Sequence, residues 1–220
     1  MTRRSLIAPT AVIFDFDLTL ADSRPGFIAS HAYAAEQMDV PAPTPEAIAR
    51  AIGTPLERIV PVMFPEASEA WVAEYIRTYR VKADEVMADL TQVLPGACET
   101  LDHLREAGLK LAIVSQKLRH LIEAVLQRES MRLDVVLGGQ DIPDFKPDPG
   151  GLILAMERLG VEADDAIYVG DTTIDAEAAA NAGLRFVGVL TGVTTRDEFT
   201  SYASLALLAN VGELPELLGL

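Results

Sequence analysis

The sequence predicts an α/β fold: a Rossmann-like parallel sheet with helices on both faces and an inserted α-helical cap domain. Short apolar runs of strand length alternate with segments of helical spacing along much of the chain. Strands that alternate with helices pair in parallel, and they are nearly all apolar because helices cover both faces of the sheet. About 90 residues separate the first two apolar runs, far more than one crossover helix needs. This distance indicates an insertion.

The expected strands span Thr10–Phe14, Leu109–Val114, Leu133–Leu137, Ala166–Val169 and Leu184–Leu190. The expected helices of the core span Ala97–Ala107, Leu118–Glu129, Gly151–Leu159, Ala176–Ala182 and a short closing segment, Glu213–Leu218. The long stretch between the first two strands also has helical spacing, and prolines that favour breaks interrupt it at 41–45, 55, 61 and 65. We therefore expect a catalytic core of residues 1–22 and 91–220 and a helical cap domain of residues 23–90.

The composition limits the partners of the protein. Its 220 residues are 50% hydrophobic, enough to bury a full core, and 18 Lys and Arg against 33 Asp and Glu give a formal charge of −15. This acidic balance argues against a nucleic acid partner, whose phosphates it would repel. No segment reaches the roughly 18 uninterrupted apolar residues of a membrane span, so no membrane partner is expected.

The sequence also favours a cytoplasmic location. Cys98 is the single cysteine, which excludes an internal disulfide framework and suits a reducing compartment. Arg3-Arg4 could be mistaken for a twin-arginine export signal, but Pro9 interrupts the following apolar stretch and no small-residue cleavage site follows. The oligomeric state, monomer or dimer, stays open.

Polar residues follow the expected strands at the points where the strands end. They are Asp15 and Asp17 after the first strand, Ser115 after the second, Lys146 shortly after the third, and Asp171 after the fourth with Asp175 close behind. Because the carboxyl ends of parallel strands open on one edge of the sheet, these side chains are expected to lie in one crevice.

Four carboxylates in one crevice need a counter-ion. Two like charges at about 4 Å repel by roughly 4 kcal/mol in a protein-like dielectric. A set of oxygen ligands suits Mg²⁺, and the substrate that matches Mg²⁺, an ammonium group and a hydroxyl is a phosphate ester. The sequence therefore predicts a magnesium cofactor and a small-molecule phosphate ester as the partner.

The ordered motifs resemble those of the haloacid dehalogenase superfamily, in particular its phosphoglycolate phosphatase branch. The motifs are Asp15-Phe16-Asp17-Leu18-Thr19, Ile113-Val114-Ser115, Phe145-Lys146-Pro147-Asp148-Pro149 and Gly170-Asp171-Thr172-Thr173-Ile174-Asp175, with Pro95-Gly96 and Asn181-Ala182-Gly183 as further similarities. The resemblance covers essentially the whole chain. Within it, Leu18 replaces a frequent glycine and Gln116 a common asparagine.

The resemblance implies a role for each residue at the strand ends. Asp15 would be the nucleophile that forms an aspartyl phosphate and would also bind Mg²⁺, while Asp17 would be the general acid and base, with its backbone carbonyl on the metal. Asp171 would be a direct or water-bridged metal ligand, and Asp175 would hold metal-bound water or orient its neighbours. Ser115 and Lys146 would bind the transferring phosphoryl group.

Asp17 also favours a phosphatase over a dehalogenase, because dehalogenases usually carry tyrosine there and cleave a bond whose leaving group needs no proton. Substrate choice is expected in the cap, where the loop from Arg50 to Arg58 resembles the Gly-x-Pro-Leu loop of phosphoglycolate and pyrophosphate phosphatases. Thr54, Arg50 and Arg58 are the candidate substrate-binding residues, the two arginines for a second anionic group or for surface salt bridges.

Other residues have structural interpretations. His31, His103 and His120 fall within helical segments without metal-site spacing, and Trp71, Tyr75 and Tyr79 recur at the four-residue spacing of a packed helix face. Asp22-Ser23 is interpreted as a turn or helix cap. Asp175 has a capping alternative as well, since aspartate at a helix start accepts from free N–H groups.

The resemblance implies a Mg²⁺-dependent phosphatase that hydrolyses a small-molecule phosphomonoester through an aspartyl phosphate, with a phosphoglycolate-like substrate by analogy. Alternative functions remain open. A phosphosugar mutase or a pyrophosphatase is possible on the same fold, although no cap histidine of the kind a mutase uses is identified. A phospho-aspartate receiver module also combines clustered aspartates with Ser or Thr and Lys on a parallel sheet. Receivers are about half this length and lack a large insert, which disfavours that class.

Overall fold

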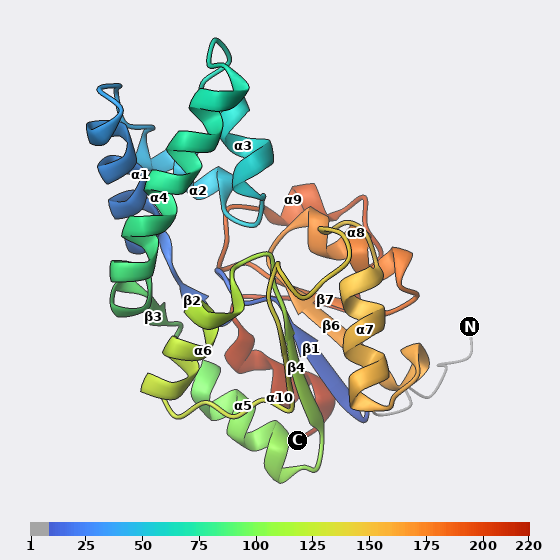
Figure 1. Ribbon diagram of the computed structural model, residues 1–220. Helices are drawn as coiled ribbons and strands as arrows, with labels where there is room; N and C mark the ends of the chain where they lie inside the picture. The colour runs from blue at the N-terminus through green and yellow to red at the C-terminus, as the bar shows by residue number, and fades with distance from the viewer. Residues whose placement is uncertain (1–8) are drawn as a thin grey trace.

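A computed structural model describes residues 9–220, so the Arg3-Arg4 segment lies outside the described residues. Six strands form one parallel sheet in the order β5-β4-β1-β6-β7-β8 (Figure 1). The strands are β1 Ala11–Phe14, β4 Lys110–Val114, β5 Val135–Leu137, β6 Ala166–Gly170, β7 Arg185–Val189 and β8 Ala206–Leu208. The predicted parallel α/β sheet is confirmed. The sequence pattern missed the three-residue edge strand β8.

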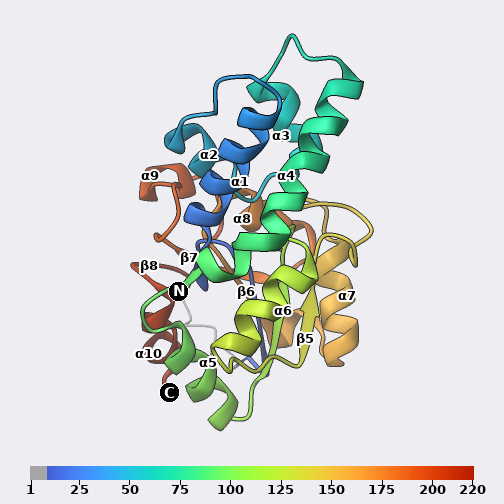
Figure 2. The same cartoon turned by 60° about the vertical axis from the view of Figure 1, so that its left-hand side comes forward.

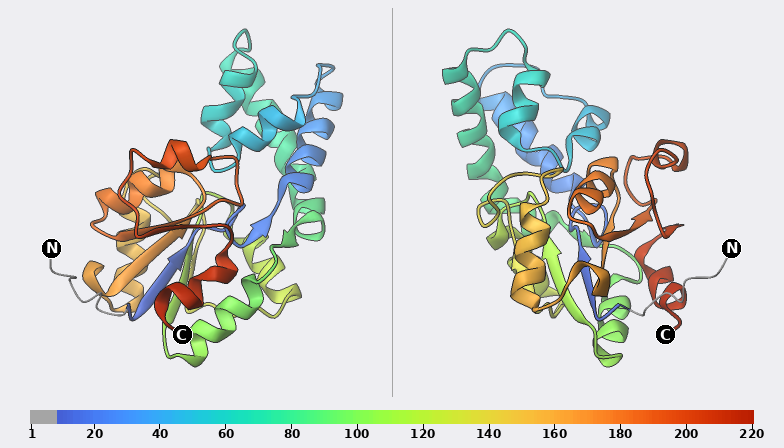
Figure 3. Two further views of the ribbon diagram at one scale, coloured as in Figure 1. Left: turned by 180° about the vertical axis from the view of Figure 1, so that it is seen from behind. Right: turned by 90° about the vertical axis from the view of Figure 1, so that its right-hand side faces the viewer.

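Helices cover both faces of the sheet. The core helices are α5 Ala97–Glu106, α6 Arg119–Arg128, α7 Gly150–Leu159, α8 Thr173–Asn181, α9 Arg196–Phe199 and α10 Leu214–Leu218, with short 3₁₀ turns at Ala163–Asp165 and Val211–Glu213. Figure 3 shows α10 at the end of the molecule away from the helical insert. Among residues 9–220, no helix combines the length and the apolar character that a membrane span requires.

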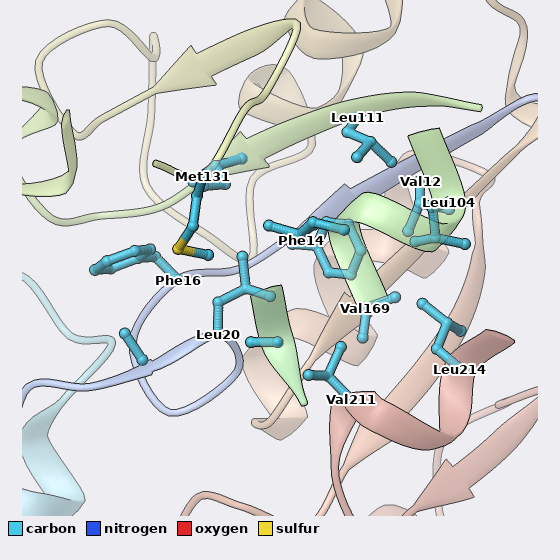
Figure 4. Close-up of a cluster of buried hydrophobic side chains, with 14 of the residues drawn as sticks. Val12, Phe14, Phe16, Leu20, Leu104, Leu111, Met131, Val169, Val211 and Leu214 are labelled. Atoms are coloured by element: carbon cyan, nitrogen blue, oxygen red, sulfur yellow. The ribbon is translucent and has the colours of Figure 1, made fainter. Parts of the chain in front are cut away.

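The residues of β1 alternate between two hydrophobic cores, as the pleat of a strand requires. Val12 and Phe14 belong to the cluster that includes residues of α5, α6 and α10, whereas Ala11 and Ile13 belong to the cluster that includes α7 and α8. Figure 4 shows Phe14 in the middle of the first cluster. Burying this side chain contributes about 1.5–3 kcal/mol, and it fixes the strand end that leads into Asp15.

The first four helices after β1 form the helical insert: α1 Arg24–Gln37, α2 Pro45–Ala51, α3 Leu56–Met63 and α4 Glu69–Leu90. The chain enters through β2 Ala21–Asp22 and returns through β3 Gln92–Val93, which pair antiparallel. Figure 2 shows the insert stacked on one end of the sheet. Pro45 starts α2 as expected, but Pro61 does not end α3, which continues to Met63.

The insert has its own hydrophobic core, in which α1 packs along α4. Tyr75 and Tyr79 are almost fully buried, and Trp71 stacks on Tyr75 with ring centroids 5.3 Å apart, so the predicted packed aromatic face is confirmed. His31 lies in this core with Nδ1 3.0 Å from the Tyr75 hydroxyl. Burial lowers the pKa of His31 from 6.5 to about 4, so the ring is neutral at pH 7.

The buried His31 predicts acid sensitivity. Because the unfolded chain protonates this ring near pH 6.5 and the folded protein only near pH 4, its contribution to stability is complete above pH 6.5 and is lost as the pH falls toward 4. We expect urea unfolding between pH 7 and pH 4 to show a loss about 3 kcal/mol larger for the wild type than for His31→Asn. His120→Asn, at an exposed position, should behave like the wild type. Equal losses in all three proteins would contradict the assignment.

Candidate active site

Asp15 and Asp171 lie beside each other because their strands are neighbours. The Asp15 backbone N–H donates to the carbonyl of Val169 at 2.8 Å, so the residue keeps the register of β1 beside β6. Asp171 directly follows β6, and Asp175 lies in the first turn of α8. One carboxylate oxygen from each of these three buried residues lies within 4.8 Å of the others. The structure thus brings together three of the four predicted carboxylates.

Lys146 is the cation of this cluster. Its Nζ lies 2.9 Å from Oδ1 of Asp15 and 2.6 Å from Oδ1 of Asp175, and it donates to the Tyr168 hydroxyl at 3.0 Å. Burial alone would lower the pKa of Lys146, but the charges of Asp15 and Asp175 raise it well above the ordinary value. The side chain is therefore a fixed ammonium group.

Asp175 acts as a helix cap and as a member of the cluster at once. Its Oδ2 accepts from the backbone N–H and the hydroxyl of Thr172, which completes a capping box at the start of α8. Its Oδ1 accepts from Lys146 and from the Tyr168 hydroxyl at 2.8 Å. Burial would raise the pKa of Asp175, but Lys146 and these hydrogen bonds hold it below its usual range. Both oxygens thus have donors already.

Asp15 and Asp171 carry the uncompensated charge. Burial raises the pKa of Asp15 to about 6, with Lys146 opposing and Asp175 adding to the rise. Burial, followed by the charges of Asp175 and Asp15, raises the pKa of Asp171 well above its usual range, and its carboxylate accepts from the Thr19 hydroxyl at 3.2 Å. Three carboxylates share one ammonium group, so this oxygen donor set fits a hard divalent cation such as Mg²⁺.

The Asp17 carboxylate lies outside this cluster of three and has its own cation. Its Oδ1 accepts from the Ser23 hydroxyl at 2.5 Å and from Nζ of Lys117 at 3.0 Å. Lys117 is buried, and its Nζ also lies 4.5 Å from the centroid of the Phe27 ring. The interpretation of Ser23 as a turn or cap residue was incomplete. It occupies the N-cap position of α1, yet its hydroxyl makes no cap hydrogen bond and binds Asp17 instead.

A tight turn follows Asp17, the second of the two aspartates. Leu18 has a positive φ of 60°, the left-handed region that favours glycine, which costs a leucine about 1–2 kcal/mol. Its side chain is 1% exposed, and burial worth about 1.5–3 kcal/mol offsets that strain. Leucine can therefore stand where the motif usually has glycine.

Gly192 packs closely against the Asp171 carboxylate. A Cβ at Gly192 would lie only 1.9 Å from Oδ2 of Asp171, so a larger residue would displace that side chain.

A cavity of about 400 Å³ connects the strand ends with the helical insert. Asp15, Asp17, Ser115 and Lys117 line it from the sheet edge, and the loop from Gly53 to Glu57 lines it from the insert together with one side of α4. Ser115 is buried at the end of β4 as predicted. Gln116 donates from Nε2 to the carbonyl of Gly53, which joins the core to the insert loop.

The three residues of the insert loop that the sequence suggested for substrate binding differ in their position relative to the cavity. Thr54 lines the cavity, whereas Arg50 and Arg58 are exposed and are not among its lining residues. The arginine that does line the cavity is Arg80 of α4, in an ion pair with Glu57 at 2.6 Å. Position in the Gly-x-Pro-Leu loop was thus a poor guide to position in the cavity, because short helices turn both predicted arginines toward solvent.

Sequence reasoning missed Lys117, Tyr168 and Arg80. Lys117 follows Ser115 by two residues in the same strand-end loop, and this position was the available signal. A lone lysine is usually exposed, however, and only the fold brings Asp17 to its ammonium group. Tyr168 sits within an apolar strand, where its hydroxyl gives no pattern to detect.

The family follows from comparison with known proteins. A family model described as haloacid dehalogenase-like hydrolase matches residues 12–189, most of the chain. The chain belongs to the haloacid dehalogenase-like hydrolases. The predicted superfamily is therefore confirmed, and the protein is an enzyme of the hydrolase class.

Individual relatives of this hydrolase agree with that assignment. It is 30% identical over 212 residues to pyrophosphatase PpaX of Bacillus velezensis, covering 96% of each chain. It is also 30% identical to a phosphoglycolate phosphatase of Xanthomonas campestris pv. campestris, covering 86% of this chain and 87% of the relative. A solved Bacteroides fragilis protein described as a haloacid dehalogenase-like hydrolase superposes with a TM-score of 0.88 at 35% identity, covering 94% of this chain and 99% of that one.

The buried pair of Lys117 and Asp17 predicts a coupled loss of stability in the hydrolase. We expect Lys117→Met to lower the free energy of unfolding by about 3 kcal/mol in buffer with EDTA, because it leaves a buried carboxylate without its cation. Adding Asp17→Asn should recover at least about 1 kcal/mol of this loss, as measured by urea unfolding.

Lys82→Met is the matched control, because its partner Glu85 is exposed, and it should change stability by at most about 1 kcal/mol. Strict additivity of the Lys117 and Asp17 substitutions would show that the two side chains do not interact as an ion pair.

Proposed function

We propose that this hydrolase is a Mg²⁺-dependent phosphatase that cleaves a small-molecule phosphomonoester through an aspartyl phosphate on Asp15. The observation that carries the proposal is the division of the two aspartates between separate lysines. Asp15 lies with Lys146 in the cluster of carboxylates, and Asp17 lies with Lys117 and Ser23 beside it. Relatives named phosphoglycolate phosphatase and pyrophosphatase support a phosphate substrate.

In the first step, a carboxylate oxygen of Asp15 attacks phosphorus while the bond from phosphorus to the leaving oxygen breaks. Asp17 gives its proton to that oxygen, so the product leaves as an alcohol. The Ser115 hydroxyl and the Lys146 ammonium group hold phosphoryl oxygens during the transfer. Lys146 suits this role because its contacts with Asp15 and Asp175 fix it without further ordering.

In the second step, Asp17 takes a proton from water, and the water oxygen attacks the phosphorus of the aspartyl phosphate. The bond from phosphorus to Asp15 breaks, so inorganic phosphate leaves and both carboxylates return to their starting states. Because Oδ1 of Asp17 accepts from Ser23 and Lys117, we assign the proton to Oδ2 in both steps.

Asp15 and Asp171 are the carboxylates we assign to Mg²⁺, with the backbone carbonyl of Asp17 as a further ligand. When bound, the ion would offset the charge of the carboxylates and of the phosphoryl oxygens. Asp175 is assigned to orientation, since its oxygens already accept from Thr172, Tyr168 and Lys146.

We also propose residues 23–90 as a cap domain that shields the reaction from water and opens for product release. Support comes from the two short strands that join the helical insert to the sheet and from the insert side chains that line the cavity. The Arg128 guanidinium donates to the Thr91 carbonyl at 2.6 Å and so holds the end of α4 against the core.

Trapping the intermediate tests this function. With Mg²⁺ and acetyl phosphate, whose leaving group needs no proton, Asp17→Asn should accumulate a phosphoryl adduct that is hydrolysed at least about 100-fold more slowly than in the wild type. Mass spectrometry should locate the adduct on residue 15, and Asp15→Asn should form none. Asp102→Asn, an exposed carboxylate on α5, is the matched control and should turn over normally.

EDTA should abolish phosphate release, and added Mg²⁺ should restore it. Full turnover by Asp15→Asn would refute the proposal. A long-lived adduct on the wild type would instead indicate a receiver. Among the described residues, no histidine lines the cavity, which disfavours a mutase that uses a cap histidine.

A further inference from the structure

The cavity beside Asp17 is larger and more apolar than a short anionic substrate requires. Its volume of about 400 Å³ lies in the range of roughly 300–1,000 Å³ in which proteins bind drug-sized ligands. Much of its wall is apolar and includes Phe27, Leu56, Met87, Leu118, Leu121 and Phe145. Several of these side chains belong to, or pack against, the hydrophobic core of the helical insert, so the wall is a packed surface.

The cations that line this cavity are already paired. Among the described lining residues these are Lys117, which binds Asp17 at 3.0 Å, and Arg80, which binds Glu57 at 2.6 Å. Acidic lining residues outnumber basic ones, since Asp15 and Asp84 also contribute. A carboxylate or a second phosphate on the leaving group would compete for these cations with Asp17, in a buried ion pair, and with Glu57, in a more exposed one.

Two cavity-lining residues have a buried polar atom without a hydrogen-bond partner among the described residues: Gln116, whose Oε1 is an acceptor, and Tyr79, whose hydroxyl can donate or accept. Oε1 of Gln116 is buried and makes no hydrogen bond with any described residue, while Nε2 of the same amide is fixed by the Gly53 carbonyl. An anionic group placed beside Gln116 would face another acceptor. A hydroxyl or N–H on an uncharged leaving group would satisfy Oε1 instead.

We infer that the substrate is the phosphomonoester of an uncharged, largely apolar alcohol of about the size of a substituted ring. This inference rests on the proposed phosphatase function and names the substrate class of the same site. The phosphoryl group lies at Asp15, the leaving oxygen at Asp17, and the apolar body contacts Met87 and Leu121. Burial of that body against a preformed apolar wall supplies the binding energy that an ion pair would supply for a short anionic ester.

2-Phenylethyl phosphate and ethyl phosphate, whose alcohol leaving groups have similar acidity, test this inference together with phosphoglycolate and pyrophosphate. With Mg²⁺, kcat/KM for 2-phenylethyl phosphate should exceed that for ethyl phosphate, phosphoglycolate and pyrophosphate by at least about tenfold each. Ala83→Leu places extra volume in the cavity from α4 and should reduce the preference for 2-phenylethyl over ethyl phosphate by at least about tenfold. Val81→Leu, on an exposed part of the same helix, should leave both rates unchanged.

Each outcome has a distinct meaning. A smaller preference for 2-phenylethyl phosphate over any of the three comparison compounds overturns the inference and leaves the phosphatase function intact. An Ala83→Leu protein that loses activity equally on 2-phenylethyl and ethyl phosphate overturns the assignment of the apolar wall to the leaving group. Failure to release phosphate from every compound overturns the proposed function together with this inference.

Discussion

Buried negative charge is the constraint on which the active-site structure depends. Asp15, Asp171 and Asp175 meet at the carboxyl edge of a parallel sheet with Lys146 as their shared ammonium group. Asp175 keeps a depressed pKa because Lys146 and its hydrogen bonds outweigh burial, whereas the pKa values of Asp15 and Asp171 are raised. The unbalanced charge therefore rests on the two carboxylates best placed to bind a divalent cation.

The backbone separates the two aspartates of the first motif so that they can serve different steps. A continued strand would direct both carboxylates to one side of the sheet, where they would compete for one cation. β1 instead ends at Phe14, and Asp15 lies with Lys146 whereas Asp17 lies with Lys117 and Ser23. Ser23 begins the helical insert, so one hydrogen bond connects the insert to the residue assigned to proton transfer.

The sequence was most informative where chemistry coincides with strand ends. Runs of apolar residues predict parallel strands, and parallel strands bring Asp15, Ser115 and Asp171 to one edge whatever their separation in the chain. Lys117 and Tyr168 could not be predicted this way, because a lysine in a loop and a tyrosine in a strand have ordinary structural roles in most sequences. Similarly, the exposure of Arg50 and Arg58 and the placement of Arg80 depend on how short helices pack, which periodicity does not determine.

Locating the bound metal tests the central claim most directly. A crystal grown with Mn²⁺ and beryllium fluoride, the latter a mimic of the aspartyl phosphate, would place both groups by anomalous scattering and electron density. The account predicts Mn²⁺ between the carboxylates of Asp15 and Asp171, beryllium fluoride on a carboxylate oxygen of Asp15, and contacts from Ser115 and Lys146 to the fluorides. Metal bound elsewhere, or beryllium fluoride on Asp17 in place of Asp15, would contradict it.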